Sequence, residues 1–300
     1  MIEVKNVTKT FGDFKALDGL ELTVPKGAVY GLVGPNGAGK TTILKTIAGI
    51  YKQTEGEVLI NGEKVFENVA VKNKMAFISD DLYFFTAYSI LDTAKFYAKT
   101  YPLWSWERFE SLKEIFKIDV NRKVRRLSKG MQKQVAFWLA VCARPEILLL
   151  DEPVDGLDPV MRRQIWTILM SEVEDKKMTV LVSSHNLREL DDVSDHVGIM
   201  NKGKVIIERS LSELQGNISK IQVACPVGMP KLPPEYKVLH MSNTGRVYTM
   251  IVKGNPKEVV QAILTDQGSP VVVDSLPLTL EEIFIYEMGG EDYEVKDILF

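Results

Sequence analysis

Cysteine is scarce in this sequence, and no long apolar run occurs. The 300 residues include two cysteines, Cys142 and Cys225, which form no C-x-x-C pair and are too few for a disulfide framework. Such usage is typical of proteins kept in a reducing compartment. No stretch approaches the ~18 apolar residues that a membrane-crossing helix needs. The amino-terminal segment MIEVKNVTKTFG alternates like a strand and lacks an apolar signal core, so we expect a chain that does not span a membrane.

An excess of charge of one sign is also absent. The formal net charge is -3, which gives no reason to expect nucleic acid as a partner. With 45% hydrophobic and 26% charged residues, the composition is that of a globular protein with room for one large domain or two small ones. The basic run over residues 122–133 is typical of a solvated face, with a place near phosphates or lipid headgroups as the alternative.

Alternating strands and helices predict the main fold. Residues 1–30 have the pattern of short strands, and residues 55–65 that of a hairpin turning at Asn61–Gly62. Over 127–210 buried strands alternate with helices, including a helix expected between 185 and 196. This alternation predicts a parallel sheet covered by helices.

Two other regions differ from this pattern. Residues 86–121 look helical, within a helical subdomain expected over about 86–126, and Ser89 and Ser105 are the expected helix caps. The tail has the pattern of a small α+β unit without a chemical motif. We therefore predict an α/β domain over residues 1–215, which contains the helical subdomain, and an accessory α+β domain over 216–300.

The segment GPNGAGKT at 34–41 matches the phosphate-binding pattern G-x-x-x-x-G-K-S/T. Its glycines allow successive backbone N–H groups to converge on phosphate oxygens, and the following helix presents its positive end. Lys40 adds a charge near the β- and γ-phosphates, and the Thr41 hydroxyl can bind Mg²⁺. An apolar strand before the loop and a helix after it are the context that this motif requires.

Acidic residues end another apolar strand. In EILLLDEP, Asp151 and Glu152 follow a buried strand at the sheet edge where ligands bind in α/β proteins. One carboxylate suits Mg²⁺, and the other can deprotonate a water. The strand in LVSSHNL ends similarly at His185, which is either a donor to the γ-phosphate or a structural histidine.

A second candidate phosphate-binding segment lies at 127–134, LSKGMQKQ, where Ser, Lys and Gly begin a helix. Over about residues 1–215 the chain resembles the ATPase subunit of an ABC transporter. The resemblance lies in five motifs and their order: GPNGAGKT, LSKGMQ, LLLDEP, GLD and SSH. The resemblance implies a P-loop NTPase of ABC type with an antiparallel β subdomain, a helical subdomain and a small C-terminal α+β domain. It also implies why one chain has two phosphate-binding segments. Two subunits form a head-to-tail dimer, and the second segment of each subunit completes the ATP site of the other.

The resemblance assigns roles to individual residues. Phe11 would stack on adenine, with core packing as the alternative. Glu152 would be the general base, His185 the γ-phosphate sensor, and Asp158 a residue of the dimer seam. The implied phosphate-binding residues are Gly34, Pro35, Asn36, Gly37, Ala38, Gly39, Lys40, Thr41 and Thr42, with Thr41, Asp80 and Asp151 for Mg²⁺, and Ser128, Lys129, Gly130 and Met131 as the signature that acts on the partner.

The sequence departs from the family pattern at two places. The usual LSGGQ is LSKGM here, with Lys129 and Met131, but Ser128 and Gly130 keep the groups that contact phosphate. The family's glutamine for Mg²⁺ and water is replaced by Asp80, a carboxylate that cannot donate a hydrogen bond when ionised. We expect coupling through this position to differ from the usual scheme.

Aromatic residues are concentrated between Tyr83 and Phe109, where ten of the chain's 26 occur. They form either the core of the helical subdomain or a groove for a helix of a membrane-embedded partner. Tyr83, Phe84 and Phe85 are the contact candidates for that partner. The segment YPLWSWERF is similar to the bacterial two-component exporters related to acetoin-utilisation and antibiotic-stress ATPases.

The leading hypothesis is an ATPase with ATP and Mg²⁺ as cofactors, acting as a homodimer or heterodimer on a separate permease at the cytoplasmic side of the membrane, and exporting its substrate. The alternatives are a soluble regulatory ABC ATPase and a module that traps nucleotide without turnover. Residues 86–126 are too short for the coiled coil of a repair ATPase, and Glu152 argues against a trapping module. The segment NKGK at 201–204 lacks the aspartate of a guanine-reading motif.

Overall fold

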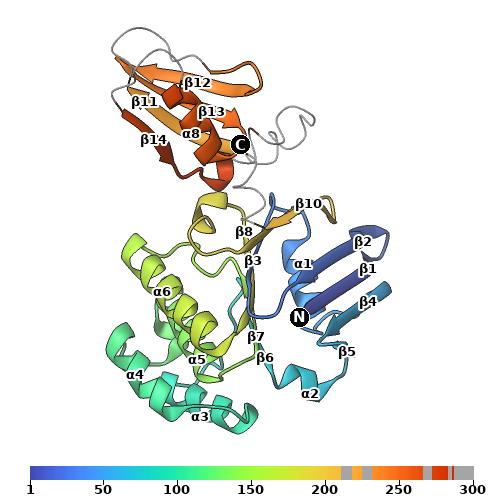
Figure 1. Cartoon of the computed structure of the whole chain (residues 1–300). Helices are drawn as coiled ribbons and strands as arrows, with labels where there is room; N and C mark the ends of the chain where they lie inside the picture. The colour runs from blue at the N-terminus through green and yellow to red at the C-terminus, as the bar shows by residue number, and fades with distance from the viewer. Residues whose placement is uncertain (211–217, 225–231, 266–271, 283–285, 287–300) are drawn as a thin grey trace. The chain divides into compact units, whose positions relative to one another are not determined.

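The structure is a computed structural model that describes residues 1–210, 218–224, 232–265, 272–282 and 286. The chain divides into two compact units (Figure 1). The first contains Met1–His185 and Val193–Glu208, and the second contains Asn186–Asp192 and Arg209–Phe300. Within the described residues, no helix has both the length and the apolar character needed to cross a membrane.

A six-stranded sheet forms the centre of the first unit. Its order is β10-β9-β3-β8-β7-β6, and the pairs from β9 through β6 are parallel. Every residue of β3 and β7 is buried, which explains their unbroken apolar sequences. The strands are β3 (Val29–Val33), β6 (Met75–Ile78), β7 (Ile147–Asp151), β8 (Thr179–Ser184), β9 (His196–Asn201) and β10 (Lys204–Ser210).

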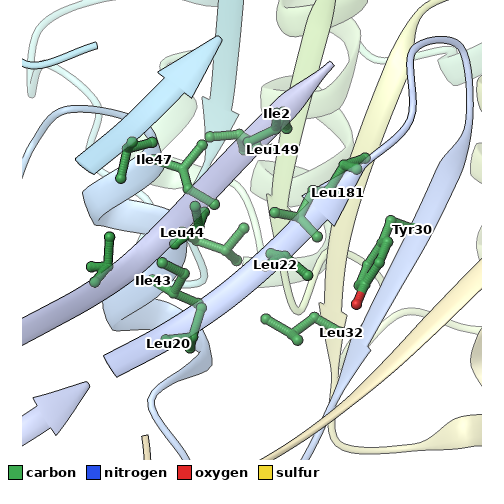
Figure 2. Close-up of a cluster of buried hydrophobic side chains, with 14 of the residues drawn as sticks. Ile2, Leu20, Leu22, Tyr30, Leu32, Ile43, Leu44, Ile47, Leu149 and Leu181 are labelled. Atoms are coloured by element: carbon green, nitrogen blue, oxygen red, sulfur yellow. The ribbon is translucent and has the colours of Figure 1, made fainter. Parts of the chain in front are cut away.

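The first unit also contains an antiparallel sheet of order β2-β1-β4-β5. It consists of β1 (Ile2–Phe11), β2 (Phe14–Val24), β4 (Glu55–Ile60) and β5 (Glu63–Lys64), and β4 and β5 form the predicted hairpin around Asn61 and Gly62. Helix α1 (Lys40–Ile47) lies between the two sheets, where Leu44 packs among leucines of β2 and β7 (Figure 2). This shared core holds the start of α1 in place.

The helical region is built on α5 (Lys129–Cys142). Helices α3 (Ile90–Thr100) and α4 (Trp106–Phe116) pack on it, and the buried ring of Trp138 stacks on Phe109 at 4.6 Å between ring centroids. Ser89 and Ser105 cap α3 and α4 as predicted. The other helices of this unit are α2 (Val69–Lys72), α6 (Pro159–Lys176) and the 3-10 turn η1 (Val124–Arg126).

The second unit contains a four-stranded antiparallel sheet and helix α8. The sheet order is β12-β13-β11-β14, and α8 packs on β11 and β14 around buried residues such as Val223 and Val259. The prediction of a helix between 185 and 196 is wrong, because the segment contains one 3-10 turn, η2 (Leu187–Glu189). The elements are β11 (Ile218–Ala224), β12 (Val238–Thr244), β13 (Val247–Lys253), α8 (Pro256–Thr265) and β14 (Val272–Leu276).

Hydrogen bonding explains why this short segment belongs to the second unit. The Leu280 N–H donates to the Asp191 carboxylate at 2.9 Å, and Arg188 Nε lies 2.9 Å from the Glu281 carboxylate. The buried residues Leu187 and Leu190 lie in the same segment. Cys142 is buried at the end of α5, whereas Cys225 lies outside the described residues.

Candidate active site

The loop between β3 and α1 accepts only glycine at two of its positions. A Cβ on Gly34 would lie 2.2 Å from the Met200 carbonyl oxygen, and one on Gly39 would lie 2.8 Å from the Ala16 carbonyl oxygen. Gly37 and Gly39 have φ values of 84° and 105°, in the region that disfavours residues with a Cβ. Helix α1 begins without a side-chain cap, so its first N–H groups face the loop without a side-chain acceptor. A loop of this kind is suited to bind an anion such as phosphate.

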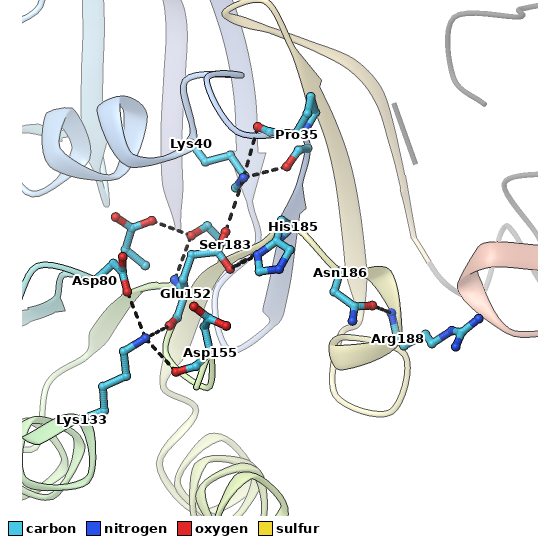
Figure 3. Close-up of polar contacts among 12 residues, drawn as sticks. Pro35, Lys40, Asp80, Lys133, Glu152, Asp155, Ser183, His185, Asn186 and Arg188 are labelled. Atoms are coloured by element: carbon cyan, nitrogen blue, oxygen red, sulfur yellow. Dashed lines mark hydrogen bonds and ion pairs between the residues drawn. The ribbon is translucent and has the colours of Figure 1, made fainter. Parts of the chain in front are cut away.

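The ammonium of Lys40 lies within this loop, and the side chain is 6% exposed. It donates to the Gly34 carbonyl oxygen at 2.7 Å and to the Pro35 carbonyl oxygen at 3.4 Å (Figure 3). Its third neighbour is Oε1 of Glu152, also at 3.4 Å. The phosphate loop and the acidic end of β7 therefore meet at one lysine.

Asp151 and Glu152 lie at this end of β7 in different surroundings. Asp151 is 1% exposed; its Oδ1 accepts from the Ser183 hydroxyl at 2.7 Å, whereas its Oδ2 is buried without a hydrogen-bond partner. Glu152 has a φ of 48°, which is uncommon for a residue with a side chain. Its N–H lies 3.2 Å from the Ser183 hydroxyl oxygen and 3.3 Å from the Ser183 carbonyl oxygen.

His185 follows β8 and completes the group. Its Nδ1 lies 2.9 Å from Oε2 of Glu152, and its backbone N–H donates to the same oxygen at 3.3 Å. Figure 3 shows Lys40 and His185 on either side of the Glu152 carboxylate. The structure thus brings together three predicted residues, Lys40, Glu152 and His185, that are far apart in the sequence.

Sequence reasoning did not identify Lys133 as part of this group. Lys133 is 9% exposed. Its ammonium donates to Oδ1 of Asp80 at 3.0 Å and to the carbonyl oxygens of Glu152 at 2.8 Å and Asp155 at 3.0 Å. The solvated-face interpretation of 122–133 is therefore wrong at Lys133. The motif LSKGMQKQ did contain a signal, because Lys133 follows four residues after Lys129, on the same side of a helix.

The candidate residues for Mg²⁺ lie at the end of β7 and the start of α1. Among the described residues, no three His, Cys, Asp or Glu side chains are grouped to hold a metal ion. The unpartnered Oδ2 of Asp151 and the exposed hydroxyl residue Thr41 at the start of α1 nevertheless suit a cation that takes its other ligands from phosphates and water. The residues present therefore fit Mg²⁺ bound together with a nucleotide.

The signature residues begin α5. The Ser128 hydroxyl accepts from the Met131 N–H at 3.3 Å, while Ser128 and Lys129 are exposed and Gly130 and Met131 are half-buried. In the described part of the chain, none of the four hydrogen-bonds to Lys40 or Glu152. Asp158 caps α6 by accepting from Val160 and Met161, at 3.1 and 3.0 Å.

Phe11 and the aromatic region lie at the surface to different extents. Phe11 is 44% exposed and meets Tyr51 edge-on at 5.3 Å between ring centroids, which disagrees with the core-packing alternative.

The three candidate contact residues for a membrane partner differ in exposure: Tyr83 is 82% exposed and Phe85 43%, whereas Phe84 is buried. A cavity of about 320 Å³ lies beside them, lined by Phe77, Tyr83, Phe84, Tyr97 and Tyr101 among others, and burial raises the pKa of Tyr97 to about 12.

Comparisons with known proteins agree with this geometry. A sequence model of the family described as ABC transporter matches residues 17–155. The chain is 35% identical to the uncharacterized ABC transporter ATP-binding protein YhaQ of Bacillus subtilis, over 97% of this chain and 99% of that protein. It is 30% identical to the bacitracin transport ATP-binding protein BcrA of Bacillus licheniformis, over 72% and 71%.

A solved structure gives the same result at the level of the fold. It is the dimeric, post-hydrolysis state of the ATP-binding cassette MJ0796 bound to ADP and Pi. The TM-score is 0.63 at 27% identity, and the match covers 70% of this chain and 99% of that one.

Proposed function

Since the chain belongs to the family of ABC transporter ATP-binding proteins and is an ATPase subunit of a transporter, we propose that ATP drives its head-to-tail dimerisation beneath a separate membrane subunit that exports a substrate. The observation that carries the proposal is the position of Glu152. One oxygen of its carboxylate faces the phosphate-loop lysine and the other faces His185. A carboxylate in this place can take a proton from a water aimed at a γ-phosphate.

Each neighbour then has a separate task. The loop from Gly34 to Thr42 binds the phosphates, and Lys40 turns from its own loop carbonyls to the β- and γ-phosphate oxygens. Mg²⁺ held by Thr41 and Asp151 would neutralise phosphate charge as the bond to the γ-phosphate breaks, whereas Asp80, which the resemblance also assigns to Mg²⁺, is paired with Lys133 at 3.0 Å. His185 orients Glu152 and donates to the γ-phosphate, and the exposed face of Phe11 takes the adenine.

The second half of the site comes from another copy or a related ATPase. Ser128 is exposed at the start of a helix of fourteen residues, and its hydroxyl and neighbouring N–H groups suit a phosphate of a facing molecule. Asp158, at the start of α6, would lie at the seam between the two molecules. A pair of such contacts related by a two-fold axis closes into a dimer.

The membrane partner would bind at the aromatic region. Exposed rings at Tyr83 and Phe85 beside a cavity offer the kind of anchor on which partner binding depends. In this proposal the chain would lie on the cytoplasmic side of the membrane, held there by its partner. A role in transport is supported by the relative named for bacitracin transport, which shares 30% identity over most of both chains.

The test compares phosphate release by the wild type, E152Q and E146Q with Mg-ATP. Glu146 is an exposed glutamate just before β7, so E146Q is a matched control. We expect E152Q to lose at least ~100-fold in kcat, the range of a general base, while E146Q keeps the wild-type rate. Turnover by E152Q at the wild-type rate would reject Glu152 as the base.

A further inference from the structure

We propose that Lys133 is a positioning residue for ATP hydrolysis, and that Asp80 is its charge partner. Lys133 donates to the backbone of the turn that carries Glu152, and through Asp80 it joins this turn to the segment after β6. The proposal rests on the role proposed above for Glu152. It adds a residue that does not touch the nucleotide and acts through the backbone of the base.

The burial of Lys133 requires an explanation. A lysine ammonium is rarely withdrawn from water unless it is paired, because removing an unpaired charge from solvent is costly. Lys133 has three N–H donors, and all three have an acceptor within 3.0 Å: Asp80 Oδ1 and the carbonyl oxygens of Glu152 and Asp155. Its charge is thus balanced by one carboxylate, and its remaining donors fix two peptide groups of one turn (Figure 3).

That turn contains a strained residue. Glu152 has a φ of 48°, and a residue with a side chain persists there only when its surroundings hold it. Its N–H is held by Ser183 and its carbonyl oxygen by Lys133, so the backbone is fixed on both sides of the side chain. Loss of the Lys133 contact would free the carbonyl side, and the carboxylate would lose its position relative to Lys40 and His185.

Asp80 and Lys133 are matched to each other. A neutral side chain at position 80 would leave the buried ammonium with two carbonyl oxygens and no negative charge. Asp80 is half exposed, 54% for its side chain, whereas the side chain of Lys133 is 10% exposed, so the carboxylate can leave the pair while the lysine cannot easily follow. Lys133 also lies on α5 five residues after Ser128, so one rigid helix joins the signature to the turn of the base.

The test uses the whole chain and measures kcat and KM for Mg-ATP in K133M, K133R and the control K99M. Lys99 is an exposed lysine of α3. We expect K133M to lose at least ~10-fold in kcat with KM within about twofold, because the contact serves the chemical step and not binding. K133R should recover part of the loss, since guanidinium keeps the charge and N–H donors, and K99M should match the wild type. If K133M does not fold, K133Q replaces it.

Unchanged kcat in folded K133M or K133Q would overturn the proposal, as would a loss of kcat matched by an equal rise in KM. If K133M keeps its rate while E152Q loses it, only the role of Lys133 fails. If E152Q keeps its rate, the assignment of the base fails first. For Asp80, D80N should lower kcat in the wild type and have no further effect in K133M; an equal effect in both backgrounds would reject the pairing.

Discussion

The ammonium of Lys40 lies 3.4 Å from Oε1 of Glu152, so the lysine of the phosphate loop and the proposed base are in direct electrostatic contact. Their side chains are 6% and 14% exposed, which limits screening by solvent. A bound γ-phosphate would compete with Glu152 for the lysine. When a nucleotide occupies the loop, the Glu152 carboxylate would then be released from Lys40 and could face a water.

This contact predicts opposite effects of two substitutions on nucleotide affinity. K40M removes the charge that faces the phosphates, and we expect the Kd for Mg-ATP to rise at least ~10-fold. E152Q removes the competing carboxylate, so its Kd should be equal to or lower than that of the wild type. Calorimetric titration with Mg-ATP measures both. Clearly weaker binding by E152Q would contradict the competition.

Gly34→Ala should abolish nucleotide binding. Its Cβ would lie 2.2 Å from a backbone carbonyl oxygen, so the loop or the end of β9 has to move. Gly62→Ala is the control, because Gly62 has a positive φ but no atom within 4 Å of an added Cβ. We expect G62A to cost about 1 kcal/mol of folding free energy and to keep its affinity. Equal affinity of G34A and the wild type in the same titration would show that this reading of the loop is wrong.

Trp138 should be the main anchor of the helical region. It is fully buried, stacks on Phe109 and donates from Nε1 to the Phe109 carbonyl oxygen at 3.1 Å. We expect W138A to lose about 3–5 kcal/mol in urea unfolding, and W138F to lose about 1–3 kcal/mol because it removes this buried hydrogen bond and part of the ring. W106F changes a ring that is 42% exposed and serves as control. A loss in W138F no larger than in W106F would contradict the hydrogen bond.

Asp191 should make the stability of the second unit depend on pH. Burial raises the pKa of this half-buried carboxyl, although its hydrogen bond from Leu280 lowers it. A carboxyl with a raised folded pKa favours folding when protonated, so its contribution falls as pH rises from below 3.8 through the raised value. D191N keeps an acceptor for Leu280 without the charge. It should therefore be more stable than the wild type at pH 7, by less than ~1 kcal/mol after screening by solvent.

D191A provides the comparison, since it removes the acceptor as well as the charge. Thermal melts at pH 4 and pH 7 should rank D191N above D191A at both values. The advantage of D191N over the wild type should shrink toward pH 4. The opposite pH trend would mean that the hydrogen bond, and not burial, dominates at Asp191.

Local patterns predicted the parts of the structure that depend on neighbouring residues. The loop containing Lys40 follows a buried strand and begins a helix, and Ser89 and Ser105 cap their helices, because these features require only a few adjacent residues. Lys133 was missed because its acceptors come from Asp80, Glu152 and Asp155, and only the folded chain brings them together.

The same reason explains the wrong helix after His185. The segment 186–192 has polar and apolar residues that suit a helix, but Asp191 bonds to the distant Leu280. Tertiary contacts within the second unit thus replace the local hydrogen bonds of a helix. Burial of Phe84 between exposed Tyr83 and Phe85 likewise depends on packing that the sequence does not show.

The most direct test of the account is the light-scattering mass of E152Q with Mg-ATP, compared with E152Q/S128R and the control E152Q/S111R. Ser111 is an exposed serine of α4, so it tests an added arginine away from the signature. The account predicts twice the monomer mass of 33.8 kDa for E152Q and E152Q/S111R, and the monomer mass for E152Q/S128R. Monomers in all three, or dimers in all three, would contradict an ATP site completed by the signature of a second copy.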